Sequence, residues 1–83
     1  MVNQYMTIGH NLYVVEIKIT EKYQGIAIET LLTEVQDAID PLLVRRKKAI
    51  LKPIELSFVL ETGDSLVLAG SLNALKTIAP RLL

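Results

Sequence analysis

The chain contains no cysteine, and its 83 residues include only one histidine, His10. Without cysteine the protein has no disulfide, no thiolate ligand for a metal ion and no cysteine nucleophile. A single histidine excludes metal motifs that need two, such as HExxH. The sequence therefore predicts neither a metal site nor a cofactor.

Net charge is also lacking, because nine lysines and arginines balance nine aspartates and glutamates. A neutral chain has no overall field that would steer it to nucleic acid or to an anionic membrane. No run of about 18 uncharged apolar residues is present, so no membrane-spanning helix is expected. Residues 1–5 lack the basic leader and apolar block of a signal peptide, and a cytoplasmic location is the default expectation.

Apolar residues make up 51% of the chain, which is enough for the core of one small domain spanning residues 1–83. A domain of this size without a disulfide or a metal has a narrow margin of stability. Self-association stabilises a folded chain by mass action, so a homo-oligomer is the expected state.

The stretch from Pro53 onward has the clearest local pattern. Residues 53–61 alternate between apolar and polar side chains, as in a half-buried strand. Residues 62–64 supply turn chemistry, and residues 65–69 predict a returning strand. Ser71 is a good N-cap for a last helix, which Pro80 should end.

The first half predicts a strand followed by helix. Residues 1–9 form either an additional strand or a frayed terminus, and residues 12–20 alternate as a strand does. From residue 26 the apolar spacing becomes helical. Asp40 and Pro41 mark either a kink or the start of a second helix, with helices expected at 26–39 and 41–51.

The expected order is therefore β–α–β–β–α. A strand, a helix and a second strand favour a β–α–β crossover, and the hairpin adds a third strand to a small mixed sheet. The fold class is α+β, a two-layer, ferredoxin-like arrangement without its final strand, with helices packed on one face. The missing strand leaves an open edge, which favours pairing with another chain.

A basic cluster is the most prominent charged feature. It comprises Arg45, Arg46, Lys47, Lys48 and Lys52. One interpretation is a patch that binds nucleic acid or another anion. The other is a solvated helix end, whose cations favour the negative end of the helix dipole. No aromatic residue is interleaved, although single-strand binding surfaces normally provide stacking platforms.

Residues that often take part in catalysis are present but not in catalytic patterns. Asp37 and Asp40 are spaced to share a cation, but oxygen-only sites need more ligands, and a hydrated helix face explains them as well. His10 has no identifiable partner, and the serines lack a GxSxG motif. No phosphate-binding glycine motif occurs. We expect neither an enzyme nor a small-molecule substrate.

Several apolar residues instead point to a protein interface. Leu12 and Val14 lie on the otherwise polar side of the first confident strand, and Val59 and Val67 lie on the second face of the predicted hairpin. A partly apolar face of this kind suits an interface better than a core. The predicted interface residues are Leu12, Tyr13, Val14, Val59 and Val67.

Residues 45–83 also resemble part of a known family. The basic segment, the sequence IELSFVLETGDSLVLAG and a short leucine-bearing helix are similar to the C-terminal half of effector-associated domains, in particular the constant component type, of bacterial conflict systems. The turn reads ETGDS, with the acidic and glycine positions transposed relative to the family. The resemblance implies a non-catalytic adaptor that brings an effector to a sensor.

Two functional hypotheses follow. The first is a non-catalytic protein-interaction or adaptor module that self-associates through a sheet edge or an apolar face. The alternative is a small nucleic-acid-binding protein that uses the basic cluster, whose binding would depend steeply on salt.

Overall fold

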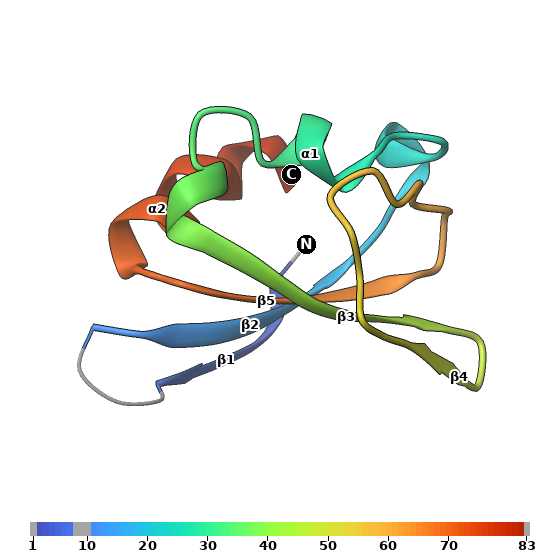
Figure 1. The fold of residues 1–83 in the computed structure, drawn as a ribbon, viewed down its shortest axis with the longest axis horizontal. Helices are drawn as coiled ribbons and strands as arrows, with labels where there is room; N and C mark the ends of the chain where they lie inside the picture. The colour runs from blue at the N-terminus through green and yellow to red at the C-terminus, as the bar shows by residue number, and fades with distance from the viewer. Residues whose placement is uncertain (1, 8–10, 83) are drawn as a thin grey trace.

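The structure is a computed structural model that describes residues 2–7 and 11–82, and it shows one sheet with helical turns on one face (Figure 1). The predicted α+β class is confirmed. In chain order the elements are β1 (Val2–Thr7), β2 (Tyr13–Lys18), η1 (Glu21–Tyr23), α1 (Ile28–Leu31), η2 (Gln36–Ala38), β3 (Ile39–Arg46), β4 (Ala49–Leu51), β5 (Ser65–Gly70), α2 (Leu72–Ile78) and η3 (Ala79–Leu82). Here η denotes a 3₁₀ turn.

The five strands are arranged in the order β1-β2-β5-β3-β4, and every pairing is antiparallel. β5 is the central strand and pairs with β2 on one side and with β3 on the other. Because β2 and β3 are both antiparallel to β5, they run parallel to each other. The chain therefore forms a split β–α–β unit with its last strand inserted between the two parallel ones. The predicted mixed, three-stranded sheet is wrong.

The core lies between the sheet and the helical layer. Alternate residues of each strand point into it, because successive side chains of a strand face opposite sides. The buried residues of the core come from β2, β3, β5, α1 and α2 and from the segments that join them: Val15, Ile17, Ile19, Ile28, Leu31, Leu32, Ile39, Val44, Leu60, Leu66, Leu68, Ala74, Leu75 and Ile78.

The helices predicted at 26–39 and 41–51 are largely wrong. Only residues 28–31 are α-helical, and Glu34 has a positive φ of 79°, which no α-helix accommodates. Residues 39–46 form β3 instead, in which Pro41 adjoins a register shift. Proline is tolerated in strands at edges and bulges, and the apolar run 42–44 fits a strand as well as a helix.

The predicted strand at 53–61 is also wrong, because this segment crosses the helical side of the sheet in an irregular path (Figure 1). Its backbone pairs with the segment leading into α1. Phe58 O accepts from Ile28 N at 2.9 Å, and Leu56 O accepts from Glu29 N at 2.8 Å. These bonds satisfy amides at the start of α1 that the helix itself leaves unpaired.

Other local predictions are confirmed. The turn at 62–64 contains Gly63 with φ 93°, and β5 follows it. Ser71 caps α2 by accepting a hydrogen bond from Ala74 N at 3.2 Å, and the helix ends at Ile78, before Pro80. β1 confirms a strand within residues 1–9; Gly9 and His10 lie outside the described residues. Among the described residues, no helix is long and apolar enough to cross a membrane.

The close approach of β5 to β3 requires glycine at position 70. A methyl group there would lie 2.7 Å from Ala38 O and 3.0 Å from Ile39 Cγ1.

We expect Gly70→Ala to lower the free energy of unfolding by about 1–3 kcal/mol, because the backbone carbonyl has to move. Urea denaturation followed by circular dichroism measures this change. Thr77→Ala, on the exposed side of α2, is the control and should change stability by less than about 0.5 kcal/mol. Equal stabilities for Gly70→Ala and the wild type would contradict the close approach.

Candidate functional site

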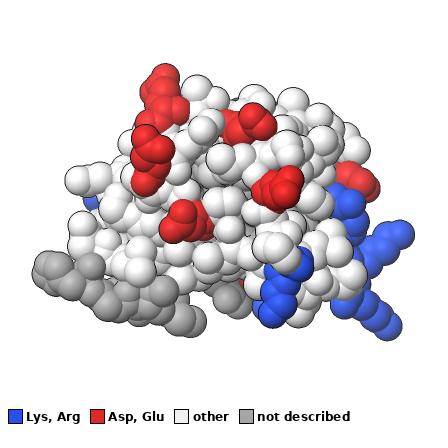
Figure 2. Space-filling model, viewed as in Figure 1, with Lys and Arg blue, Asp and Glu red and all other residues white. Residues whose placement is uncertain are grey.

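The basic cluster lies on the β3–β4 hairpin, not at the end of a helix. Lys47 and Lys48 form its two-residue turn, since Arg46 pairs with Ala49, and Lys47 adopts a positive φ of 58°. Lysine and arginine atoms gather at the right-hand edge of the surface in Figure 2, where Figure 1 shows β4 and its turn. Because side chains alternate along a strand, Arg45 and Arg46 point to opposite faces of the sheet. The structure therefore separates the two arginines of the predicted patch.

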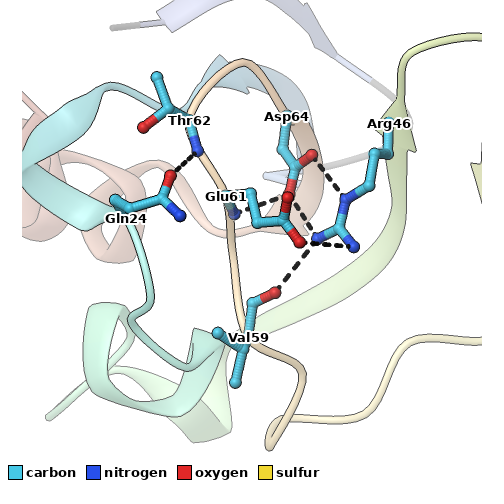
Figure 3. Close-up of polar contacts among 6 residues, drawn as sticks. All are labelled: Gln24, Arg46, Val59, Glu61, Thr62 and Asp64. Carbon is cyan, nitrogen blue, oxygen red and sulfur yellow. Dashed lines mark hydrogen bonds and ion pairs between the residues drawn. The ribbon is translucent and has the colours of Figure 1, made fainter.

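Arg46 faces the helical side and pairs with Asp64, the one buried charged residue among those described (Figure 3). Arg46 Nε donates to Asp64 Oδ1 at 3.0 Å, and Nη2 donates to Oδ2 at 2.9 Å. Nη2 also donates to Val59 O at 3.2 Å, and the guanidinium lies over the Phe58 ring, 5.1 Å from its centroid. Arg46 thereby attaches the irregular segment 52–64 to β3.

The protonation of this pair is strongly biased. Burial of the Asp64 carboxyl acts to raise its pKa, but hydrogen bonds from Arg46 and from Glu61 N, together with the arginine charge, outweigh burial and hold the pKa below its ordinary value. The hydrogen bond to Asp64 raises the pKa of Arg46. Both groups are therefore charged at neutral pH, and the carboxylate is stabilised by its partners.

A hollow of about 690 Å³ lies beside this pair, lined by Arg46, Lys47, Lys48, Ala49, Leu51, Glu61, Thr62, Gly63 and Asp64. Several of its polar groups already bind one another or residues just outside the hollow. Thr62 N donates to Gln24 Oε1, and Gly63 N donates to Ile19 O at 2.9 Å. No buried side-chain nitrogen or oxygen of the described residues lacks a partner. The hollow offers two lysines at its rim, while the amides of Thr62 and Gly63 and the guanidinium of Arg46 are already engaged.

In the part of the chain that the structure describes, the helical turns lie on one face of the sheet and the other face is open (Figure 1). The register places on this open face the residues that alternate with the core residues: Val14, Glu16 and Lys18 from β2, Ser65, Val67 and Ala69 from β5, Asp40, Leu43 and Arg45 from β3, and Ile50 from β4. Arg45 Nη1 lies 3.5 Å from Glu16 Oε2, so this ion pair spans the central strand. The open face is thus apolar at its centre and carries one ion pair between β2 and β3.

The structure brings together two of the five predicted interface residues. Val14 and Val67 lie on neighbouring strands of the open face and are half-buried. Tyr13 packs against the core on the opposite side, and Leu12 is exposed just before β2. Val59 is 50% exposed but belongs to the irregular segment, where it forms an isolated bridge with Ala27.

Two apolar residues of the open face were missed from the sequence, Leu43 and Ile50. Ile50 is 57% exposed. Both lie in the stretch predicted as helix, so only the strand assignment of 39–51 places them beside Val67. Their signal in the sequence was the apolar run 42–44 followed by a two-residue turn.

The two acidic residues considered for a cation belong to different elements, not to one helix face. Asp37 belongs to η2 and Asp40 to β3, and both are exposed. Among the described residues, no group of three or more histidine, cysteine, aspartate or glutamate side chains is arranged to hold a metal ion.

No protein-family model matches the chain, and none of the curated proteins is significantly similar to it.

The Arg46–Asp64 pair predicts a specific loss of stability on substitution. Asp64→Asn leaves the arginine without its buried counter-charge, and we expect a loss of about 2–3 kcal/mol, less than for a fully buried pair because Arg46 is 30% exposed. Glu61→Gln removes the negative charge that lies 3.1 Å from the same arginine, but the Glu61 side chain is 55% exposed. This matched control should lower stability by less than about 1 kcal/mol.

The same pair predicts how stability depends on pH. Because the pKa of Asp64 is lower in the folded chain than in the unfolded chain, its contribution is complete above about pH 5 and is lost as the pH falls through the folded value. The difference in unfolding free energy between wild type and Asp64→Asn should therefore shrink below about pH 4. Urea titrations between pH 7 and pH 2.5 measure it, and a difference that does not change with pH would contradict the assigned charge state.

Proposed function

We propose that the protein is a non-catalytic protein-interaction module that binds a partner protein through the open face of the sheet. The observation that carries this proposal is the one-sided helical layer. It leaves Val14, Leu43 and Val67 only half-buried and Ile50 largely exposed on a continuous surface of four strands. An apolar centre with a polar border is typical of a protein interface.

The ion pair on this face supports the same proposal. The Arg45 side chain is 58% exposed, while the Glu16 side chain is 13% exposed. An arginine that is held in place by a neighbouring carboxylate and still reaches solvent loses little freedom on binding, and arginine is enriched at interfaces. Arg45 is therefore better placed to contact a partner than Arg46, which is engaged by Asp64.

A non-catalytic function agrees with the way in which the buried carboxylate of Asp64 is bound by its neighbours. The buried carboxylate of Asp64 is paired with a bidentate arginine and accepts a hydrogen bond from a backbone amide. Such an arrangement is typical of a structural ion pair, because a catalytic acid or base needs access to a substrate.

The resemblance to effector-associated adaptor domains remains a proposal. Of the helix, hairpin and helix on which it was based, β5 and α2 are present, while residues 45–51 form part of a hairpin and 53–61 are irregular. A ferredoxin-like relationship likewise remains a proposal, supported by the split β–α–β unit. An adaptor in a conflict or signalling system is consistent with an exposed face that lacks catalytic groups.

Photo-crosslinking tests the open face directly. A benzophenone amino acid replaces Val67 in the full chain, expressed in cells of the source organism, and the same replacement at exposed Thr77 on α2 is the control. We expect an adduct with a discrete protein at position 67 only. The adduct should be lost when Val14→Asp is added, because a charge next to the crosslinker disrupts an apolar contact.

Circular dichroism of the double variant checks that its fold is retained. Equal crosslinking at positions 67 and 77, or an adduct at 67 that is insensitive to Val14→Asp, would overturn the proposal. Mass spectrometry of the adduct separates a foreign partner from a second copy of the chain.

The alternative, a nucleic-acid-binding protein, is supported by the exposed lysines 47, 48 and 52 around the β3–β4 hairpin. It is weakened by the engagement of Arg45 and Arg46 with carboxylates. If three lysines contact phosphates, log K should fall with log salt concentration with a slope of about −3 on duplex DNA, and Lys47→Glu/Lys48→Glu should abolish binding. Fluorescence anisotropy with labelled DNA and RNA at low salt measures this, and the absence of a complex there removes the alternative.

A further inference from the structure

The two edges of the sheet differ in their protection against pairing with another strand. At one edge, β4 has only three residues and is followed by Lys52 and Pro53. Where β3 extends beyond β4, Pro41 lacks an amide hydrogen, Asp40 is exposed and the register shifts between Pro41 and Leu43. Short strands, proline, charge and bulges are the usual means by which proteins prevent edge pairing. This edge is therefore blocked.

The opposite edge is β1, which has none of these features beyond its first residues. Its sequence, VNQYMT, contains no proline, no glycine and no charged residue. Four consecutive residues, Gln4 to Thr7, pair regularly with β2, and the one register shift lies between Val2 and Gln4. Within the part of the chain that the structure describes, no strand covers the outer edge of β1. Its outward amides and carbonyls form a template for another strand.

We propose that β1 pairs with β1 of a second copy of the chain, antiparallel and about a two-fold axis perpendicular to the sheet. An antiparallel edge is complementary to itself, because each contact between two positions is repeated on the other side of the axis. Like charges placed opposite each other destabilise such pairing, and β1 contains no charge. The net charge of the whole chain is zero, so two copies do not repel each other.

This pairing deepens the proposed function, on which its consequence rests. A two-fold axis perpendicular to the sheet keeps the helical layers of both copies on one side and both open faces on the other. The result is one continuous sheet with five strands from each copy. The dimer then presents two partner-binding faces side by side, and such a bivalent adaptor binds a paired partner more tightly than a single face does.

The absence of cysteine from the chain makes a direct test possible. Single variants Gln4→Cys, Tyr5→Cys and Met6→Cys are oxidised separately, with Ile50→Cys on the blocked edge as the control. Opposed residues in antiparallel strands have Cα atoms about 4.5–5.5 Å apart, within the range of a disulfide. Only the residue on the two-fold axis lies opposite the same residue of the second copy. One of the three variants should therefore crosslink at least about tenfold faster than the control.

Mixing provides a second readout. Two variants whose cysteines lie at equal distances on either side of the axis should crosslink with each other but not with themselves. Uniform crosslinking at all positions, or rates no higher than that of Ile50→Cys, would overturn the β1 pairing.

Sedimentation of two proline variants, Tyr5→Pro and Met6→Pro, adds an independent measurement. Neighbouring amides of a strand point to opposite edges, so one substitution removes an amide that faces β2 and the other removes an amide at the outer edge. One variant should lose the β1–β2 ladder, and the other should stay folded as a monomer. If both variants stay folded and both keep the mass of the wild type, the proposal is contradicted.

The two proposals can fail separately. If a dimer forms but position 67 gives no adduct, the open-face function fails and the pairing stands. If position 67 gives an adduct but no dimer forms, only the pairing fails.

Discussion

The structure depends on the position of β5 between β2 and β3. This strand comes late in the chain, so its two ladders join segments that are far apart in sequence. Its inward residues Leu66 and Leu68 are fully buried under the helical layer, and Gly70 allows the backbone of Ala38 and Ile39 to approach. With β5 in place, the parallel strands β2 and β3 share one face and one core. The folding transition therefore has to bring the C-terminal third of the chain to the N-terminal half, a contact pattern that is slow to form.

The Arg46–Asp64 pair extends this arrangement to the least regular segment. Residues 52–64 make few ladder contacts, yet they cover the core through Leu60 and cap the start of α1 with their carbonyl groups. A bidentate arginine at the end of β3 holds the last turn of this segment where β5 begins. Buried ion pairs contribute modest net stability, but they discriminate against alternative packings in which the charge is unpaired. Arg46, one of the five residues of the basic cluster, therefore serves the fold.

The functional proposals follow from what the helical layer leaves uncovered. With one layer of helical turns on a five-stranded sheet, the chain has an open face and two edges, and the two edges differ in length and composition. One edge is shortened and carries proline and charge, whereas the other is long and neutral. The open face combines half-buried apolar residues with the Glu16–Arg45 ion pair across β5. Pairing at the neutral edge and binding at the open face are compatible, because they use different groups: backbone amides and carbonyls at the edge, side chains on the face.

The sequence by itself determined β2, the turn at Gly63, β5 and the capped helix α2, because period-2 alternation, a positive-φ glycine and a serine N-cap act within a few residues. It also placed Val14 and Val67 outside the core. Tertiary structure alone decided that 39–46 is a strand, since Ile39 reaches the core in either conformation and only pairing with β5 selects the extended one. It likewise decided that 53–61 stays irregular, because β2 and β3 occupy both edges of β5. Ladder partners are distant in sequence, and no local pattern specifies them.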